Sequence, residues 1–123
     1  MRWNHTGLKT ANLEKSIHFY CDTLGFRKLE KVEVLGRLYH FVGNDTVNIE
    51  IEVCKLSDTQ ADMREHTGLY HLCFTVDDLE KTAADLKQKG VTFMMPPSQF
   101  RPDRKIAFIQ DPDGVIIQLI QYL

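Results

Sequence analysis

Four residues that could bind a metal or move a proton occupy matching places in the two halves of this 123-residue sequence. They are His5, Glu50, His71 and Gln118. A single histidine on an apolar strand is more often a packed core residue than a ligand. Two equivalent histidines, with a carboxylate and an amide oxygen that are also equivalent, instead suit a divalent ion such as zinc, nickel, cobalt, manganese or iron(II). We therefore treat the four as candidate metal ligands.

The equivalence of these positions rests on an internal repeat. Segment 5–16 can be laid over segment 71–82, where a histidine, a Leu-Glu-Lys run and a following hydroxyl residue coincide. Further on, 40–42 aligns with 107–109, and 47–51 aligns with 115–119 after a one-residue adjustment in the turn. The repeat predicts one domain made of two modules, residues 1–57 and 68–123, joined by a polar stretch near 57–67.

Each module is expected to run strand, helix, then three strands. Asn12 and Asp78 are good N-caps, because their side chains can accept from the free amides of a first helical turn. Apolar residues recur at helical spacing after both caps, and the helices should end before Gly25 and Gly90.

The strands are expected from alternating or continuous apolar runs. The expected strands are 5–10, 27–34, 37–42 and 47–53 in the first module, and 71–76, 91–95, 104–110 and 115–122 in the second. Pro96, Pro97 and Pro102 predict an interrupting loop, because proline cannot donate to a strand ladder. The predicted topology is βαβββ, repeated, in an α+β fold.

The strand pattern predicts which face carries chemistry. Alternation over 47–53 places Glu50 and Glu52 together on one polar face, which in an isolated strand usually points at water. Gln118, the match of Glu50, has isoleucines two residues away on either side, so its face is expected to be a buried wall. An unpaired buried amide costs about 1–3 kcal/mol, so Gln118 needs a partner. Glu52 is the alternative ligand if the register is shifted by one strand-pair step.

Two arginines are equivalent in the same alignment. Arg37 and Arg104 fall at matching places in their modules. A guanidinium near a metal site could hold a carboxylate or phosphate of a substrate, so both are candidate substrate-binding residues. The alternative is ordinary charge at a strand edge.

Composition narrows the class of protein. A net charge of −2 argues against nucleic acid as the main partner, since a phosphate-binding surface normally shows a basic excess. Cys21, Cys54 and Cys73 are odd in number and widely spaced, which favours a reducing cytoplasm over a disulfide framework. No apolar run approaches the roughly 20 residues that a spanning helix needs, so no membrane role is expected.

Three stretches resemble a known superfamily. "HTGLKTANLEKSIHFYCDTLGF", "GLYHLCFTVDDLEKT" and "FIQDPDGVIIQLIQ" are similar to signatures of the glyoxalase/bleomycin-resistance/extradiol-dioxygenase superfamily, also called vicinal oxygen chelate. The resemblance implies curled mixed sheets that enclose a metal-binding cup. It also implies ligands from the first and last strand of each module, which here are His5, Glu50, His71 and Gln118. Members of this size commonly form homodimers and sometimes build sites from modules of two chains.

The resemblance also suggests a reaction. It implies a metal-dependent lyase or isomerase similar to glyoxalase I, acting on a small α-oxygenated compound or its thiol adduct. Glyoxalase I typically carries a catalytic carboxylate where this chain has Gln118, and an amide cannot act as a base. Glu50 is therefore the candidate base, with Glu52 a potential helper.

Two other functions compete with the lyase. One is an iron(II) dioxygenase that uses His5, His71 and Glu50 as a two-histidine, one-carboxylate triad. The other is a bleomycin-type binding protein, or a related fosfomycin-type thiol transferase, that uses the cup for antibiotic resistance.

Overall fold

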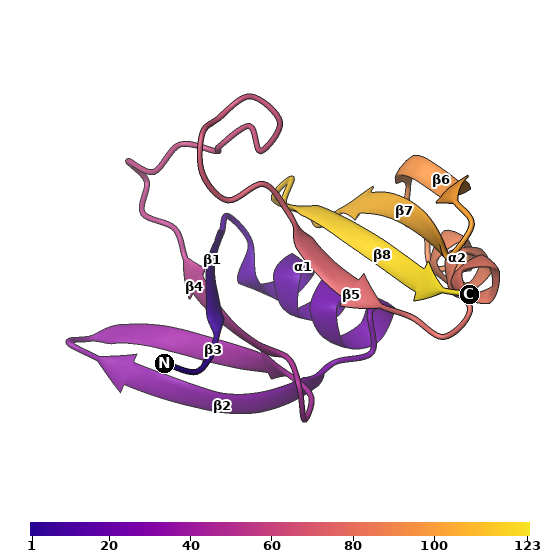
Figure 1. Ribbon diagram of the computed structural model, residues 1–123. Helices are drawn as coiled ribbons and strands as arrows, with labels where there is room; N and C mark the ends of the chain where they lie inside the picture. The colour runs from indigo at the N-terminus through magenta and orange to yellow at the C-terminus, as the bar shows by residue number, and fades with distance from the viewer. The chain divides into compact units, whose positions relative to one another are not determined.

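A computed structural model describes residues 1–123, which form two compact units, Met1–Thr59 and Gln60–Leu123. The first unit contains β1 (Thr6–Thr10), α1 (Leu13–Ile17), η1 (His18–Thr23), β2 (Arg27–Val34), β3 (Arg37–Gly43) and β4 (Asn48–Val53) (Figure 1). The second contains β5 (Leu72–Thr75), α2 (Leu79–Gln88), β6 (Phe93–Arg101), β7 (Arg104–Gln110) and β8 (Ile116–Tyr122). None of the helices has the length and apolar character needed to cross a membrane.

The two units repeat one sheet topology. The sheet order is β1-β4-β3-β2 in the first unit and β5-β8-β7-β6 in the second. The first strand of each unit runs parallel to the last, and the remaining pairs are antiparallel, so both sheets are mixed. The α+β class and the repeated βαβββ order predicted from the sequence are confirmed. In each unit the first and last strands therefore lie side by side, so residues far apart in the sequence share one face of the sheet.

Side-chain caps start both main helices where the sequence predicted. The amide of Lys15 donates to Asn12 Oδ1, and the amide of Lys81 donates to Asp78 Oδ1, both at 3.0 Å. The first helix is not a single α-helix, however, because α1 passes into η1, a π-helix of six residues. Gly25 adopts a φ of 84° just after it, a left-handed conformation that glycine takes without steric cost.

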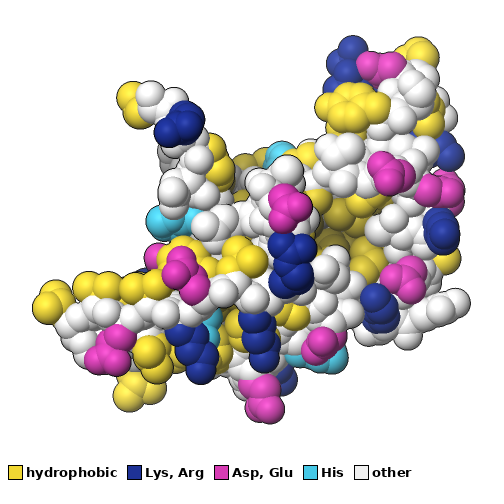
Figure 2. Space-filling model, turned by 90° about the horizontal axis from the view of Figure 1, so that it is seen from below, with side chains coloured by type: hydrophobic (Ala, Val, Ile, Leu, Met, Phe, Trp, Pro, Cys, Tyr) yellow, Lys and Arg dark blue, Asp and Glu magenta, His cyan; other side chains and the backbone are white.

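One face of each sheet packs on its own helix. In the first unit, Tyr20, Val42 and Ile51 are fully buried. In the second unit, Leu79, Ile109 and Ile117 are likewise fully buried. Apolar burial of this kind stabilises the fold by roughly 1.5–3 kcal/mol for each large side chain. On the outer surface, charged side chains of both signs are interspersed among apolar ones (Figure 2).

The expected loop at Pro96 and Pro97 is wrong, because β6 runs straight through both prolines. β6 pairs only with β7, at the edge of its sheet, so a missing ladder donor can face outward. The pairing slips in register between Met95 and Ser98, which accommodates the two prolines. The turn between β6 and β7 contains Pro102, as expected.

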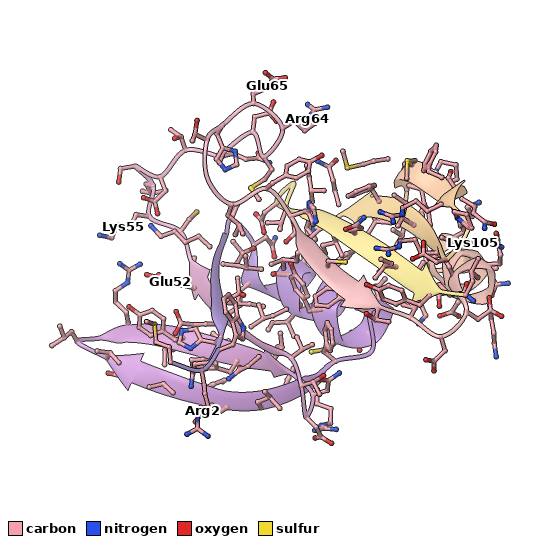
Figure 3. The ribbon with its side chains drawn as sticks, viewed as in Figure 1. Arg2, Glu52, Lys55, Arg64, Glu65 and Lys105 are labelled. Atoms are coloured by element: carbon pink, nitrogen blue, oxygen red, sulfur yellow. The ribbon has the colours of Figure 1, made fainter.

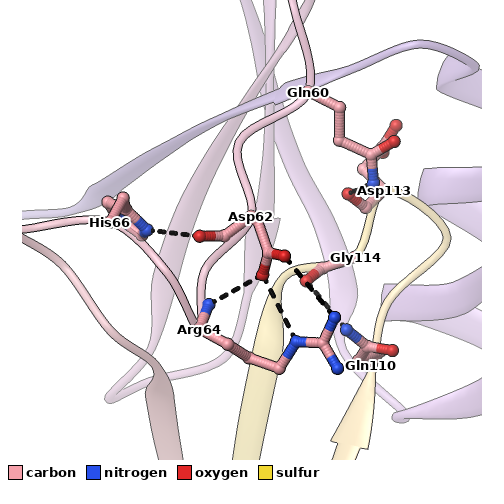
Figure 4. Close-up of polar contacts among 7 residues, drawn as sticks. All are labelled: Gln60, Asp62, Arg64, His66, Gln110, Asp113 and Gly114. Atoms are coloured by element: carbon pink, nitrogen blue, oxygen red, sulfur yellow. Dashed lines mark hydrogen bonds and ion pairs between the residues drawn. The ribbon is translucent and has the colours of Figure 1, made fainter.

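The segment that opens the second unit is tied to the turn before β8 (Figure 4). Gln60 Nε2 donates to the carbonyl of Asp113 at 2.6 Å. Within the segment, the amide of Arg64 donates to Asp62 Oδ1 at 3.0 Å, and His66 Nδ1 lies 2.8 Å from the carbonyl of Asp62. Gly114 has a φ of 84°, which strains any residue with a side chain, and a Cβ there would displace the Gln60 amide, whose Nε2 would lie 2.7 Å away. This segment therefore belongs structurally to the second unit.

Candidate functional site

In the first unit, the candidate ligands His5 and Glu50 lie together. His5 immediately precedes β1, and Glu50 lies in β4 opposite Gly7 in the parallel register. His5 Nε2 lies 3.6 Å from Glu50 Oε2. The parallel pairing of β1 with β4 thus brings together an imidazole and a carboxylate that are 45 positions apart in the sequence.

The other ring nitrogen of His5 is held by its neighbour. His5 Nδ1 lies 2.6 Å from Asn4 Oδ1, which can only accept a hydrogen bond. Nδ1 must therefore carry a proton, and in the neutral ring Nε2 then presents a lone pair toward Glu50. Two acceptors facing each other at this distance are stabilised by a positive charge between them, either a proton or a metal ion.

The same aromatic contact supports the histidine in both units. Phe41 lies opposite Glu50 in β3, and its ring meets His5 edge-on, with centroids 5.6 Å apart and planes at 83°. Phe108 lies opposite Gln118 in β7, and its ring meets His71 at 5.8 Å and 81°. The register thus places the four candidate ligands at equivalent positions, as the repeat predicted.

The second unit differs at the residue before the histidine. Tyr70 stands where the first unit has Asn4, and its ring packs against His71 with centroids 4.8 Å apart. His71 Nδ1 is consequently buried without a hydrogen-bond partner. Gln118 is half-buried, so its amide remains accessible on the face of the sheet that it shares with Cys73, its register partner.

Glu52, the alternative ligand, is already engaged. It forms an ion pair with Arg37, and its side chain is only 16% exposed. The Arg37 guanidinium also donates to the carbonyl of Val53 at 3.5 Å. Glu52 projects from the sheet of the first unit (Figure 3). The structure therefore leaves Glu50 as the carboxylate beside His5.

A second ion pair stands beside this one. Lys9, the register partner of Glu52, donates to Asp58 at 2.9 Å. This hydrogen bond raises the pKa of Lys9 and lowers the pKa of Asp58 from their usual values. The charged side chains around Lys9 and Glu52 are thus paired with one another.

Arg104 is also engaged by a neighbour. Its guanidinium donates to Asp103 at 2.6 and 3.1 Å and lies 5.2 Å from the ring centroid of Tyr122. The bond from Arg104 holds the pKa of Asp103 below its usual value. Both candidate substrate-binding arginines therefore have protein partners, which a substrate anion would have to displace.

Three residues of the site were not singled out from the sequence. Asn4 and Tyr70 control the Nδ1 atoms of the histidines, and their only sequence signal is adjacency to a candidate ligand. Asn48 lies two residues before Glu50 on the same face, and its Oδ1 is buried without a hydrogen-bond partner. Its alternation with Glu50 was visible in the sequence, whereas its burial depends on the fold.

The donor set fits a divalent ion in type. Each unit carries one imidazole and one oxygen donor, and no group of three or more histidine, cysteine or carboxylate side chains gathers in the structure. Ligands bonded at about 2.1 Å to one ion lie roughly 3–3.5 Å apart, close to the 3.6 Å between His5 and Glu50. The unpartnered Nδ1 of His71 lacks the outer hydrogen bond that a ligating histidine usually makes.

Named relatives resemble the chain over most of its length. It is 33% identical to the lactoylglutathione lyase of Neisseria meningitidis serogroup B, over 98% of this chain and 91% of that protein. It is 31% identical to the probable lactoylglutathione lyase of Synechocystis sp., over 95% of this chain and 92% of that protein.

Solved structures share the fold. The glyoxalase family protein from Enterococcus faecalis superposes with a TM-score of 0.82 at 24% identity, over 97% of this chain and 96% of that one. A glyoxalase I variant from Zea mays superposes with a TM-score of 0.78 at 28% identity, over 94% of this chain and 43% of that one. The profile of the Glyoxalase/Bleomycin resistance protein/Dioxygenase superfamily matches residues 2–119. The chain belongs to this superfamily.

Proposed function

We propose that the protein is a metal-dependent lyase or isomerase resembling glyoxalase I, acting on a small α-oxygenated substrate or its thiol adduct. The observation that carries the proposal is the pair of acceptors formed by His5 Nε2 and Glu50 Oε2 at 3.6 Å, with Asn4 holding the proton on the far side of the ring. The relatives named lactoylglutathione lyase support the choice of reaction class.

The proposed ligands are His5, Glu50, His71 and Gln118, holding zinc, nickel, cobalt, manganese or iron. The matched contacts of Phe41 and Phe108 with the two histidines support equal roles for His5 and His71. A bound divalent ion would polarise adjacent substrate oxygens and stabilise negative charge on them.

Proton transfer falls to Glu50 in this proposal. Gln118 is a neutral oxygen donor, and Glu52 is paired with Arg37, so Glu50 is the carboxylate free to accept a proton from substrate carbon. Phe41 and Phe108 would orient the imidazoles by their edge-on contacts. A substrate carboxylate or phosphate would reach Arg37 or Arg104 only by competing with Glu52 or Asp103.

Metal analysis of the purified protein, followed by turnover of the glutathione–methylglyoxal adduct with each ion restored, tests the proposal. The native protein is expected to bind about one divalent ion per site, and His5→Ala and His71→Ala are each expected to lose it. His18→Ala is the matched control, because His18 is exposed on η1 and pairs only with Asp22. Full metal content in both ligand variants would overturn the ligand assignment.

An oxygenase is the second candidate, favoured by the number of carboxylates among the candidate ligands. Because Gln118 is an amide and Glu52 is engaged by Arg37, the set reduces to two histidines and one free carboxylate, which suits iron(II) and oxygen chemistry. Oxygen consumption with a catechol under iron(II), together with no turnover of the thiol adduct, would support it. Tight binding of a cationic antibiotic by metal-free protein would instead support a bleomycin-type binder.

We also propose that the protein is a homodimer, which light scattering on the purified chain tests. Mixing His5→Ala with His71→Ala chains then locates the sites. Restored metal binding in the mixture would indicate sites built from two chains, because one site then keeps both histidines. No restoration would indicate sites built within one chain.

A further inference from the structure

A cleft of about 730 Å³ opens within the first unit, between the helical segment and the hairpin of β2 and β3. Its volume falls within the range of small-molecule pockets in proteins. The residues that the argument uses are Leu13, Ile17, Lys28, Leu29, Lys31 and His40.

The cleft lies across the sheet from the candidate metal ligands. In the β2–β3 register, Lys28 is opposite Val42 and Lys31 is opposite His40, so these side chains share one face of the hairpin. Phe41, which contacts His5, also lines the cleft, but alternation along β3 directs its side chain to the other face, toward Glu50. A ligand in the cleft would therefore approach the sheet on the side away from His5 and Glu50.

Lys28, Lys31 and His40 lie on this face of the β2–β3 hairpin, together with the apolar Val42. Neither Lys28 nor Lys31 forms an ion pair. The pKa of His40 is lowered, first by burial and then by the charges of Lys31 and Lys28, so both lysines act on this ring.

Three carboxylates also line the cleft. Glu30 is opposite Phe41 in the register, so alternation directs its side chain to the other face of the hairpin. Asp22 lies 2.8 Å from His18 Nδ1, a ring that is charged only when protonated, and Glu14 lies in the first turn of α1. Lys28 and Lys31 thus lie on the hairpin side of the cleft, whereas Asp22 and Glu14 lie on the helical side.

The remaining lining is apolar. Leu13 and Ile17 come from α1, and Leu29 lies at the register shift in β2, where it is 41% exposed. Leu29 is thus a large exposed apolar side chain close in sequence to both lysines, an arrangement suited to a ligand with one charged end and an apolar body.

We propose that this cleft binds a small carboxylate with an aliphatic tail, whose head lies between Lys28 and Lys31 and whose tail packs on Leu13, Ile17 and Leu29. The proposal is independent of the metal-dependent function, because none of these residues belongs to the candidate metal site.

Titration of the full-length protein with decanoate, followed by NMR of backbone amides, tests the proposal. Saturable 1:1 binding with shifts concentrated in α1, η1, β2 and β3 is expected. Octanoate should bind roughly tenfold more weakly, because each buried methylene contributes about 0.8 kcal/mol. Decanol, which has the tail without the charge, should bind at least tenfold more weakly than decanoate.

Variants identify the groups responsible. Lys28→Gln with Lys31→Gln should weaken decanoate binding at least tenfold, whereas Lys15→Gln with Lys81→Gln, which removes the same charge from exposed positions outside the cleft, should leave it unchanged. Leu29→Ser should weaken binding severalfold without a large folding cost. His5→Ala should bind decanoate normally, which separates this proposal from the metal site. Equal losses in both lysine pairs, equal binding of decanol, or no saturable binding would overturn the proposal.

Discussion

Arg37 pairs with Glu52, the carboxylate two residues along β4 from Glu50, and so leaves Glu50 alone beside His5. This difference predicts unequal effects of two isosteric substitutions. Glu50→Gln is expected to lower kcat for the thiol adduct by about 10²–10⁴, the usual contribution of a general base. Glu52→Gln should retain turnover within about tenfold, because it removes the pair with Arg37 and leaves the carboxylate beside His5 in place. The reverse order of losses would move the base to Glu52.

Asn4 is expected to control metal affinity through the tautomer of His5. Asn4→Ala removes the acceptor 2.6 Å from Nδ1 and should weaken divalent-ion binding about 10–100-fold, as loss of an outer hydrogen bond typically does. Competition with a chelator of known affinity measures the change. Gln88→Ala, at the exposed end of α2, is the control. Unchanged affinity in Asn4→Ala would show that Asn4 does not act on the ligand.

Gln118→Glu is expected to tighten metal binding. The substitution replaces a neutral oxygen by an anionic one on a half-buried wall, where charge interactions are stronger than in water. We expect about tenfold higher affinity at neutral pH, measured by the same competition, and a loss of that gain as the new carboxylate is protonated at low pH. Weaker binding in Gln118→Glu than in the native protein would argue against Gln118 as a ligand.

The hairpin turn between β2 and β3 offers a stabilising substitution. Leu35 has a φ of 51° and Gly36 a φ of 77°, and Leu35 is 99% exposed. A left-handed conformation costs a residue such as leucine about 1–2 kcal/mol, and Asn-Gly is the preferred pair in such turns. Leu35→Asn should therefore raise the free energy of unfolding by roughly 0.5–1 kcal/mol in urea titrations. Leu56→Asn, exposed but outside a left-handed position, should have no comparable effect.

His40 is expected to titrate below its usual pKa. Burial disfavours the imidazolium, and Lys31 and Lys28 repel it further. The unfolded chain therefore binds this proton more readily, so the stability contribution is complete above about pH 6.5 and falls as pH decreases toward the folded pKa. An NMR titration should give a midpoint below 6.5, and Lys31→Gln should raise it part of the way, whereas Lys81→Gln should not. A midpoint at or above 6.5 would contradict the burial of this ring.

The starts of the helices could be predicted from the sequence, because hydrogen bonds between residues a few positions apart determine them. Asn12 and Asp78 cap helices that begin at the following residue, as their side chains predicted. The strand through Pro96 and Pro97 could not be predicted, because proline excludes a central strand and only the sheet order shows that β6 is an edge. The spacing of apolar residues in the first helix suits both an α-helix and a π-helix. The sequence therefore does not indicate that its second half, η1, is π-helical.

For the candidate site, the sequence predicted only the equivalences that follow from the internal repeat. Equivalence of Glu50 and Gln118 follows from the alignment, and the strand registers agree with it. The engagement of Arg37 by Glu52, and of Arg104 by Asp103, depends on where long side chains reach in the folded chain. The contact of Asn4 with His5 depends on a single rotamer, which a linear pattern does not encode.

The near-identical packing of His5 on Phe41 and of His71 on Phe108 gives the molecule an internal spectroscopic reference. An edge-on phenyl ring imposes the same kind of ring-current shift on each imidazole, so this contribution largely cancels when the two histidine signals are compared. The remaining difference between the two signals comes from two pairs of unlike neighbours. The residue before the histidine is Asn4 in one unit and Tyr70 in the other, and the matching residue on the last strand is Glu50 or Gln118. One two-dimensional spectrum of the native chain can thus report the combined influence of these neighbours without any substitution.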